Sequence, residues 1–87
     1  MYKVEFSKQA VKDLKKLDKS VSTVIVSWID KNLVNCESPR FIGKSLKGNL
    51  SSFWRYRIGD YRIIVKIEDK KLIIIVITIG HRKEVYK

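Results

Sequence analysis

Hydrophobic and polar residues alternate with a period of two in several stretches of the chain, a pattern typical of strands with one buried face. These stretches are MYKVEF (1–6), FWRYRI (53–58), YRIIVKI (61–67) and the more uniformly apolar LIIIVITI (72–79). Gly59-Asp60 and the polar EDKK that follows residue 67 predict tight turns between the last three. We expect the strand at 72–79 to be buried on both faces near the centre of the sheet.

Residues 7–35 show a helical period instead. Ser7 is the expected N-cap of a first helix that runs through Asp18. A second helix is expected from Ser20 or Ser22 to Asn35, and the two helices should form a hairpin joined around Lys19 and Ser20. The expected buried residues of the second helix are Val21, Val24, Ile25, Trp28 and Leu33.

The predicted order of elements is strand, helix, helix, strand, strand, strand. The economical arrangement is an α+β domain in which the helical hairpin covers one face of a mostly antiparallel sheet of about four strands. A chain of 87 residues can bury one hydrophobic core. We therefore expect residues 1–87 to form a single domain.

Alternation places three arginines on one face of the predicted hairpin. Arg55 and Arg57 share a face of their strand, opposite its aromatic side chains. Across the turn, Arg62 is expected to lie beside Arg57 on the same face. If the aromatic face meets the helices, the arginines point away from them. Because like charges at this spacing repel, an anionic ligand would stabilise them, and ordinary solvated charge is the alternative interpretation.

The overall charge also suits an anionic partner. The chain carries 19 Lys and Arg against nine Asp and Glu, a net charge of +10. Residues 1–39 have a net charge of +2, whereas residues 40–87 have a net charge of +8. The second half therefore suits nucleic acid or an acidic protein, although a high charge can also serve solubility alone.

Composition excludes several other kinds of site. Cys36 is the only cysteine and His81 the only histidine, so we expect no disulfide framework, no metal site and no other cofactor. The longest apolar run, 72–80, is too short to span a bilayer, and the amino terminus has no signal-peptide pattern. We expect a cytoplasmic protein with no membrane partner.

The tail IGHRKEVYK (79–87) adds polar groups at the end of the last strand. Gly80 is expected to turn the backbone, so that His81, Arg82 and Tyr86 emerge there. His81 either transfers a proton, as histidine can near neutral pH, or is an exposed tail residue. Tyr86 stacks on a base, exchanges a proton or anchors the tail.

The strands and tail lack the sets of residues that several types of reaction require. Paired carboxylates, a Gly-rich phosphate loop and a Ser-His-Asp set are all absent from the strands and tail. Positive charge without a metal fits one reaction well, the cleavage of RNA by attack of a 2′-hydroxyl on the adjacent phosphate. DNA lacks this internal nucleophile.

Three motifs, SLKG (45–48), WRYRIGDYRIIV (54–65) and IGHRKEVY (79–86), together resemble the RelE branch of the RelE/ParE toxins of bacterial toxin-antitoxin systems. The resemblance covers essentially the whole chain and implies the compact microbial-ribonuclease-like α+β fold of that family. It also implies a toxin that enters the ribosomal A site, cuts messenger RNA within the codon without a metal, and so inhibits translation.

Matching positions in these motifs imply roles for individual residues. Lys47 and Arg62 resemble the basic residues that stabilise the transition-state phosphate, and Lys44 is expected to help bind RNA. Arg82 matches the residue that protonates the leaving group. Tyr86 matches the tyrosine that stacks on the substrate base.

Two departures from the family pattern change the expected chemistry. Arg55 and Arg57 stand where the family has a basic pair, one member of which takes the proton from the 2′-hydroxyl. Because arginine stays protonated, we expect both to act as electrostatic clamps and assign proton transfer to His81 or Tyr86. Val65 stands where the family can have a tyrosine, so one stacking partner is missing.

The resemblance also implies partners. It implies a small, partly disordered, RelB-like antitoxin, whose acidic segment would suit the basic half of the chain. The resulting hetero-oligomer would reach operator DNA only through the antitoxin, and the toxin itself would bind the ribosome and messenger RNA. The alternative is a ParE-like inhibitor of DNA gyrase with the same fold and no nuclease activity. A decayed toxin kept as an interaction module or co-repressor is a third possibility.

Overall fold

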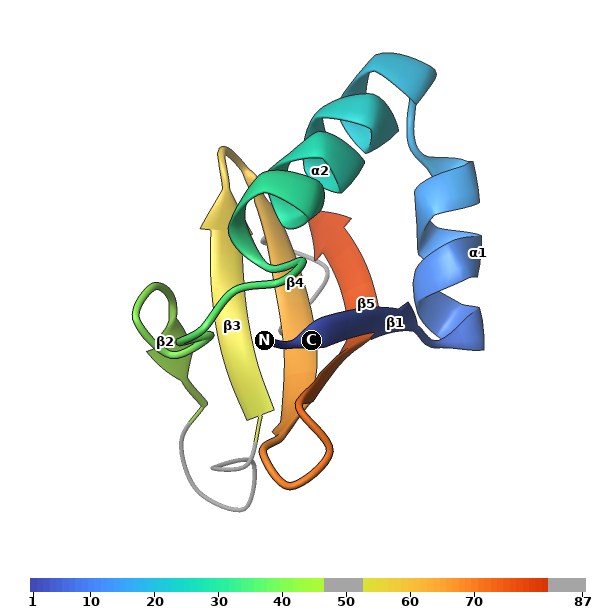
Figure 1. Cartoon of the computed structure of the whole chain (residues 1–87). Coiled ribbons are helices and arrows are strands. Elements are labelled where there is room, and N and C mark those ends of the chain that lie inside the picture. Colours follow the sequence, from blue (N-terminus) through green and yellow to red (C-terminus); the bar gives the residue numbers. More distant parts are fainter. Residues whose placement is uncertain (47–52, 82–87) are drawn as a thin grey trace.

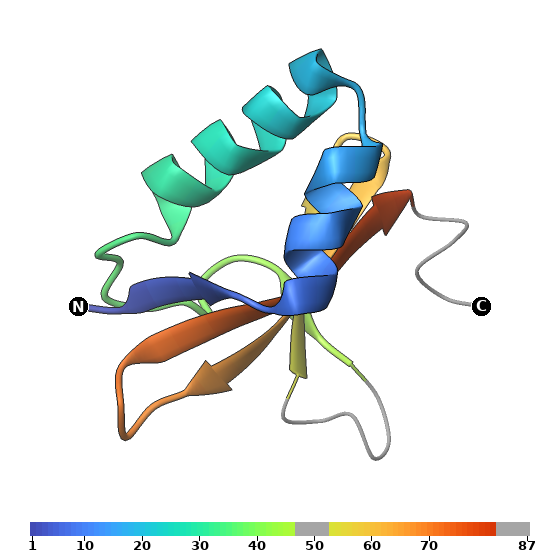
Figure 2. The same ribbon diagram turned by 90° about the vertical axis from the view of Figure 1, so that its right-hand side faces the viewer.

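A computed structural model of the chain describes residues 1–46 and 53–81. Its elements are β1 (Lys3–Phe6), α1 (Lys8–Lys16), α2 (Lys19–Asn32), β2 (Lys44–Ser45), β3 (Phe53–Ile58), β4 (Tyr61–Glu68) and β5 (Ile73–His81). The strands form one sheet in the order β1-β5-β4-β3-β2, antiparallel except for the parallel β1-β5 pair. Both helices lie on one side of this sheet (Figure 1), and Figure 2 shows them above it. The predicted α+β fold is confirmed.

The predicted β3-β4 hairpin is confirmed in its register. Ile58 pairs with Tyr61, and Arg57 pairs with Arg62. Gly59 in the turn has a φ of 58°, a left-handed conformation that glycine adopts without steric cost. On the helix side, the ring of Tyr56 lies 5.4 Å from that of Trp28 in α2. The aromatic face of the hairpin therefore meets the helices, as predicted.

Ser7 caps α1, as the sequence predicts, and also joins the helix to the sheet. Its Oγ accepts a hydrogen bond from the Ala10 N–H at 3.0 Å and donates one to the Ile77 carbonyl at 2.7 Å. Helix α1 ends at Lys16, and Asp18 is the N-cap of α2. The joint between the helices therefore lies slightly before the predicted one.

The buried side of α2 differs from the prediction at two positions. Ile25, Ile29 and Leu33 are buried, whereas Val24 is 58% exposed. Residues four apart lie on one side of a helix, so Ile25, Ile29 and Leu33 form a single ridge. Val24 is one residue off this ridge and faces solvent. The prediction of Val24 was wrong, and Ile29 was missed.

Helix α1 also covers the part of β5 that β1 does not reach. Strand β1 pairs with β5 only as far as Val76. Beyond that point, the Asp13 carboxylate of α1 accepts hydrogen bonds from the Ile79 N–H at 2.9 Å and the Thr78 hydroxyl at 2.8 Å. Side chains of α1 thus take the place of a neighbouring strand at this edge.

The predictions for the last strand were wrong in two respects. Strand β5 is an inner strand beside the central β4, as predicted, but its buried residues lie mainly on its helix side, whereas β4 is buried on both faces at 63–65. Gly80 does not turn the backbone, because it lies within β5 opposite Arg62. The strand continues to His81, which pairs with Tyr61.

A fifth strand, β2, adds to the roughly four that the sequence predicts. It has two residues, with Lys44 opposite Arg55 and Ser45 opposite Trp54. A pairing this short leaves no period-two pattern in the sequence. Within the described ranges, neither helix has the length and apolarity needed to cross a membrane.

Candidate nucleic-acid interface

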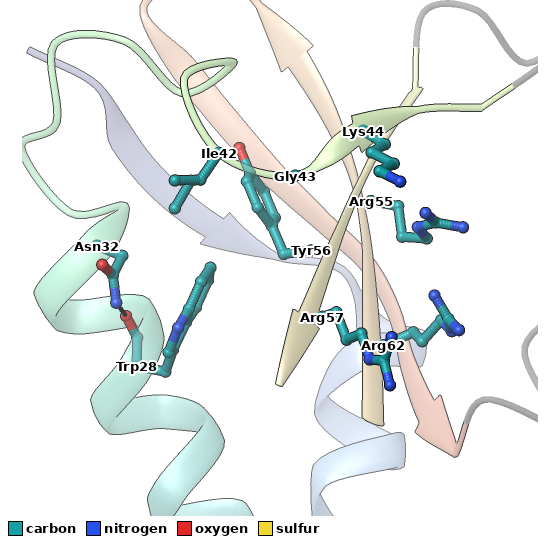
Figure 3. Close-up of a pocket in the computed structure, with 9 residues that line it drawn as sticks. All are labelled: Trp28, Asn32, Ile42, Gly43, Lys44, Arg55, Tyr56, Arg57 and Arg62. Carbon is teal, nitrogen blue, oxygen red and sulfur yellow. Dashed lines mark hydrogen bonds between the residues drawn. The ribbon is translucent and has the colours of Figure 1, made fainter. Parts of the chain in front are cut away.

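Four cationic side chains gather on the face of the sheet that points away from the helices. Arg57 and Arg62 are direct cross-strand partners, and Lys44 of β2 lies opposite Arg55. Figure 3 shows the four side chains pointing to the same side of β3. Lys44 and Arg57 are exposed, and the other two are half-buried. The predicted arginine face is thus present, with Lys44 added to it.

The spacing of Arg57 and Arg62 follows from the hydrogen-bond pattern of the sheet. The Leu46 N–H donates to the Phe53 carbonyl at 3.3 Å, so the odd-numbered residues of β3 direct their backbone groups towards β2. Arg57 and Arg62 therefore face each other as a non-hydrogen-bonded pair, the type with Cα atoms about 4.5 Å apart. Two positive charges at this spacing repel each other. An anion between them would relieve that repulsion.

These residues line one side of a cavity of about 510 Å³ that runs past the edge of β3. Its lining residues are Trp28, Asn32, Ile42, Gly43, Lys44, Arg55, Tyr56, Arg57 and Arg62. The cavity has a cationic side, formed by Lys44 and the arginines, and an aromatic side, formed by Trp28 and Tyr56 across β3 (Figure 3).

Gly43 brings β2 close enough to place Lys44 beside Arg55. Its φ is 83°, and a Cβ atom there would lie 2.4 Å from the Arg55 carbonyl oxygen. Such an approach is open only to glycine. The Trp54 indole N–H donates to the Ile42 carbonyl at 2.7 Å and holds the preceding residue in place. Gly43 was not predicted as a functional position, because its only signal in the sequence is a glycine directly before a basic residue.

The far end of the same loop is fixed by a separate polar cluster. Arg40 makes a bidentate ion pair with Asp69, at 2.8 and 3.0 Å, and the Tyr2 hydroxyl donates to the same carboxylate at 2.7 Å. The hydrogen bonds from Arg40 and Tyr2 lower the pKa of the Asp69 carboxyl. Arg40 therefore belongs to the scaffold and adds no charge to the arginine face.

Tyr56 links the loop to the core. Its hydroxyl donates to the Pro39 carbonyl, and its ring is 1% exposed. Burial raises the pKa of Tyr56 well above its usual value. This hydroxyl therefore holds the loop and is no source of protons for chemistry.

His81 lies apart from the arginines. Because it pairs with Tyr61, and Gly80 pairs with Arg62, His81 is on the helix side of the sheet. Its ring packs edge-on against Tyr61, with centroids 5.6 Å apart. The structure thus brings Lys44, Arg55, Arg57 and Arg62 together and leaves His81 outside their cavity.

Other predicted positions have different outcomes. Lys47, Arg82 and Tyr86 lie outside the described residues. Val65 is fully buried and belongs to the core. Cys36 is half-buried, and its burial raises the pKa of the thiol, which favours the unreactive protonated form. In residues 1–46 and 53–81, His, Cys, Asp and Glu form no group of three that could hold a metal ion.

The chain matches a known protein family over nearly its whole length. The family model described as ParE toxin of type II toxin-antitoxin system, parDE, matches residues 4–86. The chain is 28% identical to Toxin RelG of Mycobacterium tuberculosis, over 99% of this chain and 97% of that protein. It is 32% identical to the mRNA interferase toxin RelE of Escherichia coli K12, over 98% of this chain and 90% of that protein.

Solved structures show the same fold. The toxin-antitoxin complex RelBE2 of Mycobacterium tuberculosis contains a chain that matches with a TM-score of 0.84 at 28% identity, covering 93% of this chain and 98% of that one. The isolated E. coli RelE toxin matches with a TM-score of 0.75 at 28% identity, covering 99% of this chain and 92% of that one. The chain therefore belongs to the RelE/ParE family of toxins from type II toxin-antitoxin systems.

Proposed function

We propose that this toxin cleaves messenger RNA in the ribosomal A site, by attack of a 2′-hydroxyl on the adjacent phosphate. The observation that carries the proposal is the arginine face, in which Arg57 and Arg62 stand at the closest cross-strand spacing. A phosphate between them would relieve their repulsion. The interaction would strengthen as negative charge develops on the phosphorane, which lowers the barrier. The E. coli relative named mRNA interferase supports this activity.

The arginines bind charge in this mechanism and do not transfer the first proton. Arg55, Arg57 and Arg62 clamp the phosphate, with Lys44 and Lys47 extending the RNA track. Proton transfer falls to His81 or Tyr86, and Arg82 protonates the leaving oxygen. His81 points to the helix side of the sheet, so it would reach only RNA that crosses the end of β5. A His81→Ala variant that cleaves messenger RNA as well as the wild type would exclude His81 from proton transfer.

The partner that restrains this activity is proposed to be an RelB-like antitoxin. The solved toxin-antitoxin complexes RelBE of E. coli and RelBE2 of M. tuberculosis support such a pairing. An acidic antitoxin segment would suit the net charge of +8 on residues 40–87. We propose that the resulting hetero-oligomer works in the cytoplasm and reaches operator DNA through the antitoxin.

A translation extract supplies the test of the nuclease proposal. We expect the purified toxin to cut messenger RNA within codons, as mapped by primer extension. The variant Arg57→Ala should lose this cutting about 100-fold or more. Lys66→Ala is the matched control, because Lys66 lies on the same face at the other end of the β3-β4 pair. Intact messenger with wild-type toxin would refute the proposal.

The match to the ParE family model favours a second candidate, inhibition of DNA gyrase without RNA cleavage. A supercoiling assay run beside the translation assay separates the two. Gyrase inhibition with intact messenger RNA would establish the second candidate. Messenger cleavage without any effect on supercoiling would exclude it.

A further inference from the structure

The aromatic side of the cavity is not used by the proposed phosphate clamp. Trp28 and Asn32 come from α2, on the helix side of β3, and Ile42 comes from the loop before β2. Figure 3 shows them across β3 from the arginines. In the part of the chain that the structure describes, β2 pairs with β3 at Arg55 and Trp54 and does not reach Arg57, so the cavity can pass the edge of β3 there. One ligand can therefore contact both sides.

Asn32 offers a hydrogen-bonding pair at this aromatic side. One hydrogen of its side-chain amide is donated to the Trp28 carbonyl at 2.9 Å. A primary amide has a second N–H hydrogen and a carbonyl oxygen. Asn32 is exposed, and no partner for these two groups occurs in the part of the chain that the structure describes. A donor and an acceptor side by side match the edge of adenine, where asparagine can bind N6 and N7 together.

Trp28 offers a ring held in place by the core. It is half-buried, and its ring packs against the buried Tyr56 at an angle of 51°. The packing fixes one side of the indole while the cavity reaches another. Bases of single-stranded nucleic acid stack on such rings. The cavity of about 510 Å³ is within the size range of small-ligand sites, about 300 to 1,000 Å³.

We propose that Trp28 and Asn32 form a nucleobase site that selects adenine in the bound RNA, next to the phosphate held by the arginines. This proposal rests on the proposed RNA cleavage and makes it more specific, because it assigns the RNA substrate a preferred base. Trp28 stacks on the base, and Asn32 reads its edge. The arginine side contacts the backbone and is indifferent to sequence.

The test measures binding without cleavage or ribosomes. Fluorescein-labelled trinucleotides carrying 2′-O-methyl groups cannot be cut, and fluorescence anisotropy gives their Kd. We expect the wild type to bind the A-containing trinucleotide about tenfold more tightly than one with U in its place. Asn32→Ala should remove this preference and retain the weaker binding. Arg57→Ala should weaken both trinucleotides equally.

Two further variants control the comparison. Ser27→Ala removes a polar group from an exposed position of α2 outside the cavity and should leave the preference unchanged. Asn32→Asp replaces the donor-acceptor pair with two acceptors and should also remove the adenine preference. Because Ser27 and Asn32 are both exposed, neither substitution should disturb folding, which circular dichroism checks.

Equal Kd values for A and U with the wild type, or an adenine preference that survives in both Asn32 variants, would overturn the site. The proposed function fails separately, in the translation assay. A toxin that leaves messenger RNA intact yet shows the Asn32-dependent preference would keep the base site and lose the nuclease. A toxin that cuts messenger RNA but binds all trinucleotides alike would do the reverse.

Discussion

The two faces of the β3-β4 hairpin share one backbone but carry side chains of opposite kinds, which are buried and apolar on one face and cationic on the other. On the helix face, Tyr56, Ile63 and Val65 are at most 1% exposed. On the other face, Arg57 and Arg62 stand opposite each other. Successive side chains of a strand point to opposite faces, so packing on one face can hold like charges together on the other. The core therefore holds the fold together, and it keeps two like charges opposite each other at a spacing where we expect them to repel.

Truncation of the helix face should have the largest effect on stability. Ile63→Ala removes a fully buried side chain and is expected to lower the free energy of unfolding by about 2 to 5 kcal/mol. Urea denaturation followed by circular dichroism measures it. Val24→Ala is the control, because that side chain is 58% exposed and should cost well under about 1 kcal/mol. Equal losses for the two variants would contradict the packing described above.

Truncation of the arginine face should reverse this result. Arg57→Ala is expected to change the free energy of unfolding by no more than a few tenths of a kcal/mol. It removes a like-charge pair but also the exposed hydrogen bond from Arg57 Nε to the Gly59 carbonyl at 3.3 Å. RNA cleavage should fall about 100- to 1,000-fold, the loss usual for one charge-stabilising donor. Denaturation and primer extension on the same preparation give both numbers. A destabilisation like that of Ile63→Ala would show that Arg57 supports the fold.

The assignment of side chains to the two faces could be predicted from sequence, because it follows from alternation along the strands. The stretch WRYRIGDYR fixes which side chains share a face, because a two-residue turn leaves one register, and the structure has that register. Ser7 could likewise be identified as a helix cap, since its residue type and position before an apolar period state the role locally.

The parts that depend on distant contacts could not be predicted. A turn at Gly80 separated His81 from the strand in the sequence interpretation, whereas a continuous β5 puts it on the helix face by parity. Strand β2 is fixed by the close approach of Gly43 to β3, which no local pattern encodes. Asn32 joins the cavity because α2 packs on the helix side of β3, where Trp28 contacts Tyr56, so its part depends on tertiary packing.

A substitution at Gly43 tests whether RNA binding by the arginine face depends on the position of β2. In Gly43→Ala the added Cβ would meet the Arg55 carbonyl at 2.4 Å, so β2 must move away. We expect a loss of about 1 to 3 kcal/mol in the free energy of unfolding, from strain and the left-handed φ. Lys44 would move with β2, and RNA binding should weaken. Gly59→Ala is the control, because its Cβ meets nothing within 4 Å, although its φ of 58° also costs some stability. Equal RNA affinities in the two variants would contradict a role for β2 in the site.

The smallest expected effect is a pH dependence of the unfolding free energy that comes from the helix face and not from the arginine face. Desolvation raises the pKa of the Asp13 carboxyl, but hydrogen bonds from Ile79, Gln9 and Thr78 outweigh it and lower the pKa below its ordinary value. The contribution of this carboxylate to stability is therefore full above the unfolded-state pKa of about 3.9 and is lost as the pH falls through the lower folded-state value.

Asp13→Asn cannot titrate at this position, so its difference from the wild type isolates that contribution. We expect this difference in unfolding free energy to be constant from about pH 7 to pH 5 and to shrink below about pH 4. Urea denaturation at each pH measures it. Binding of a 2′-O-methyl trinucleotide by folded protein at pH 5 to 7 should be the same in both proteins, because Asp13 lies on the other side of the sheet from the arginine face. Since Asp13 holds α1 to β5 on the helix side, a change of RNA affinity in Asp13→Asn would show that the two faces are coupled through β5.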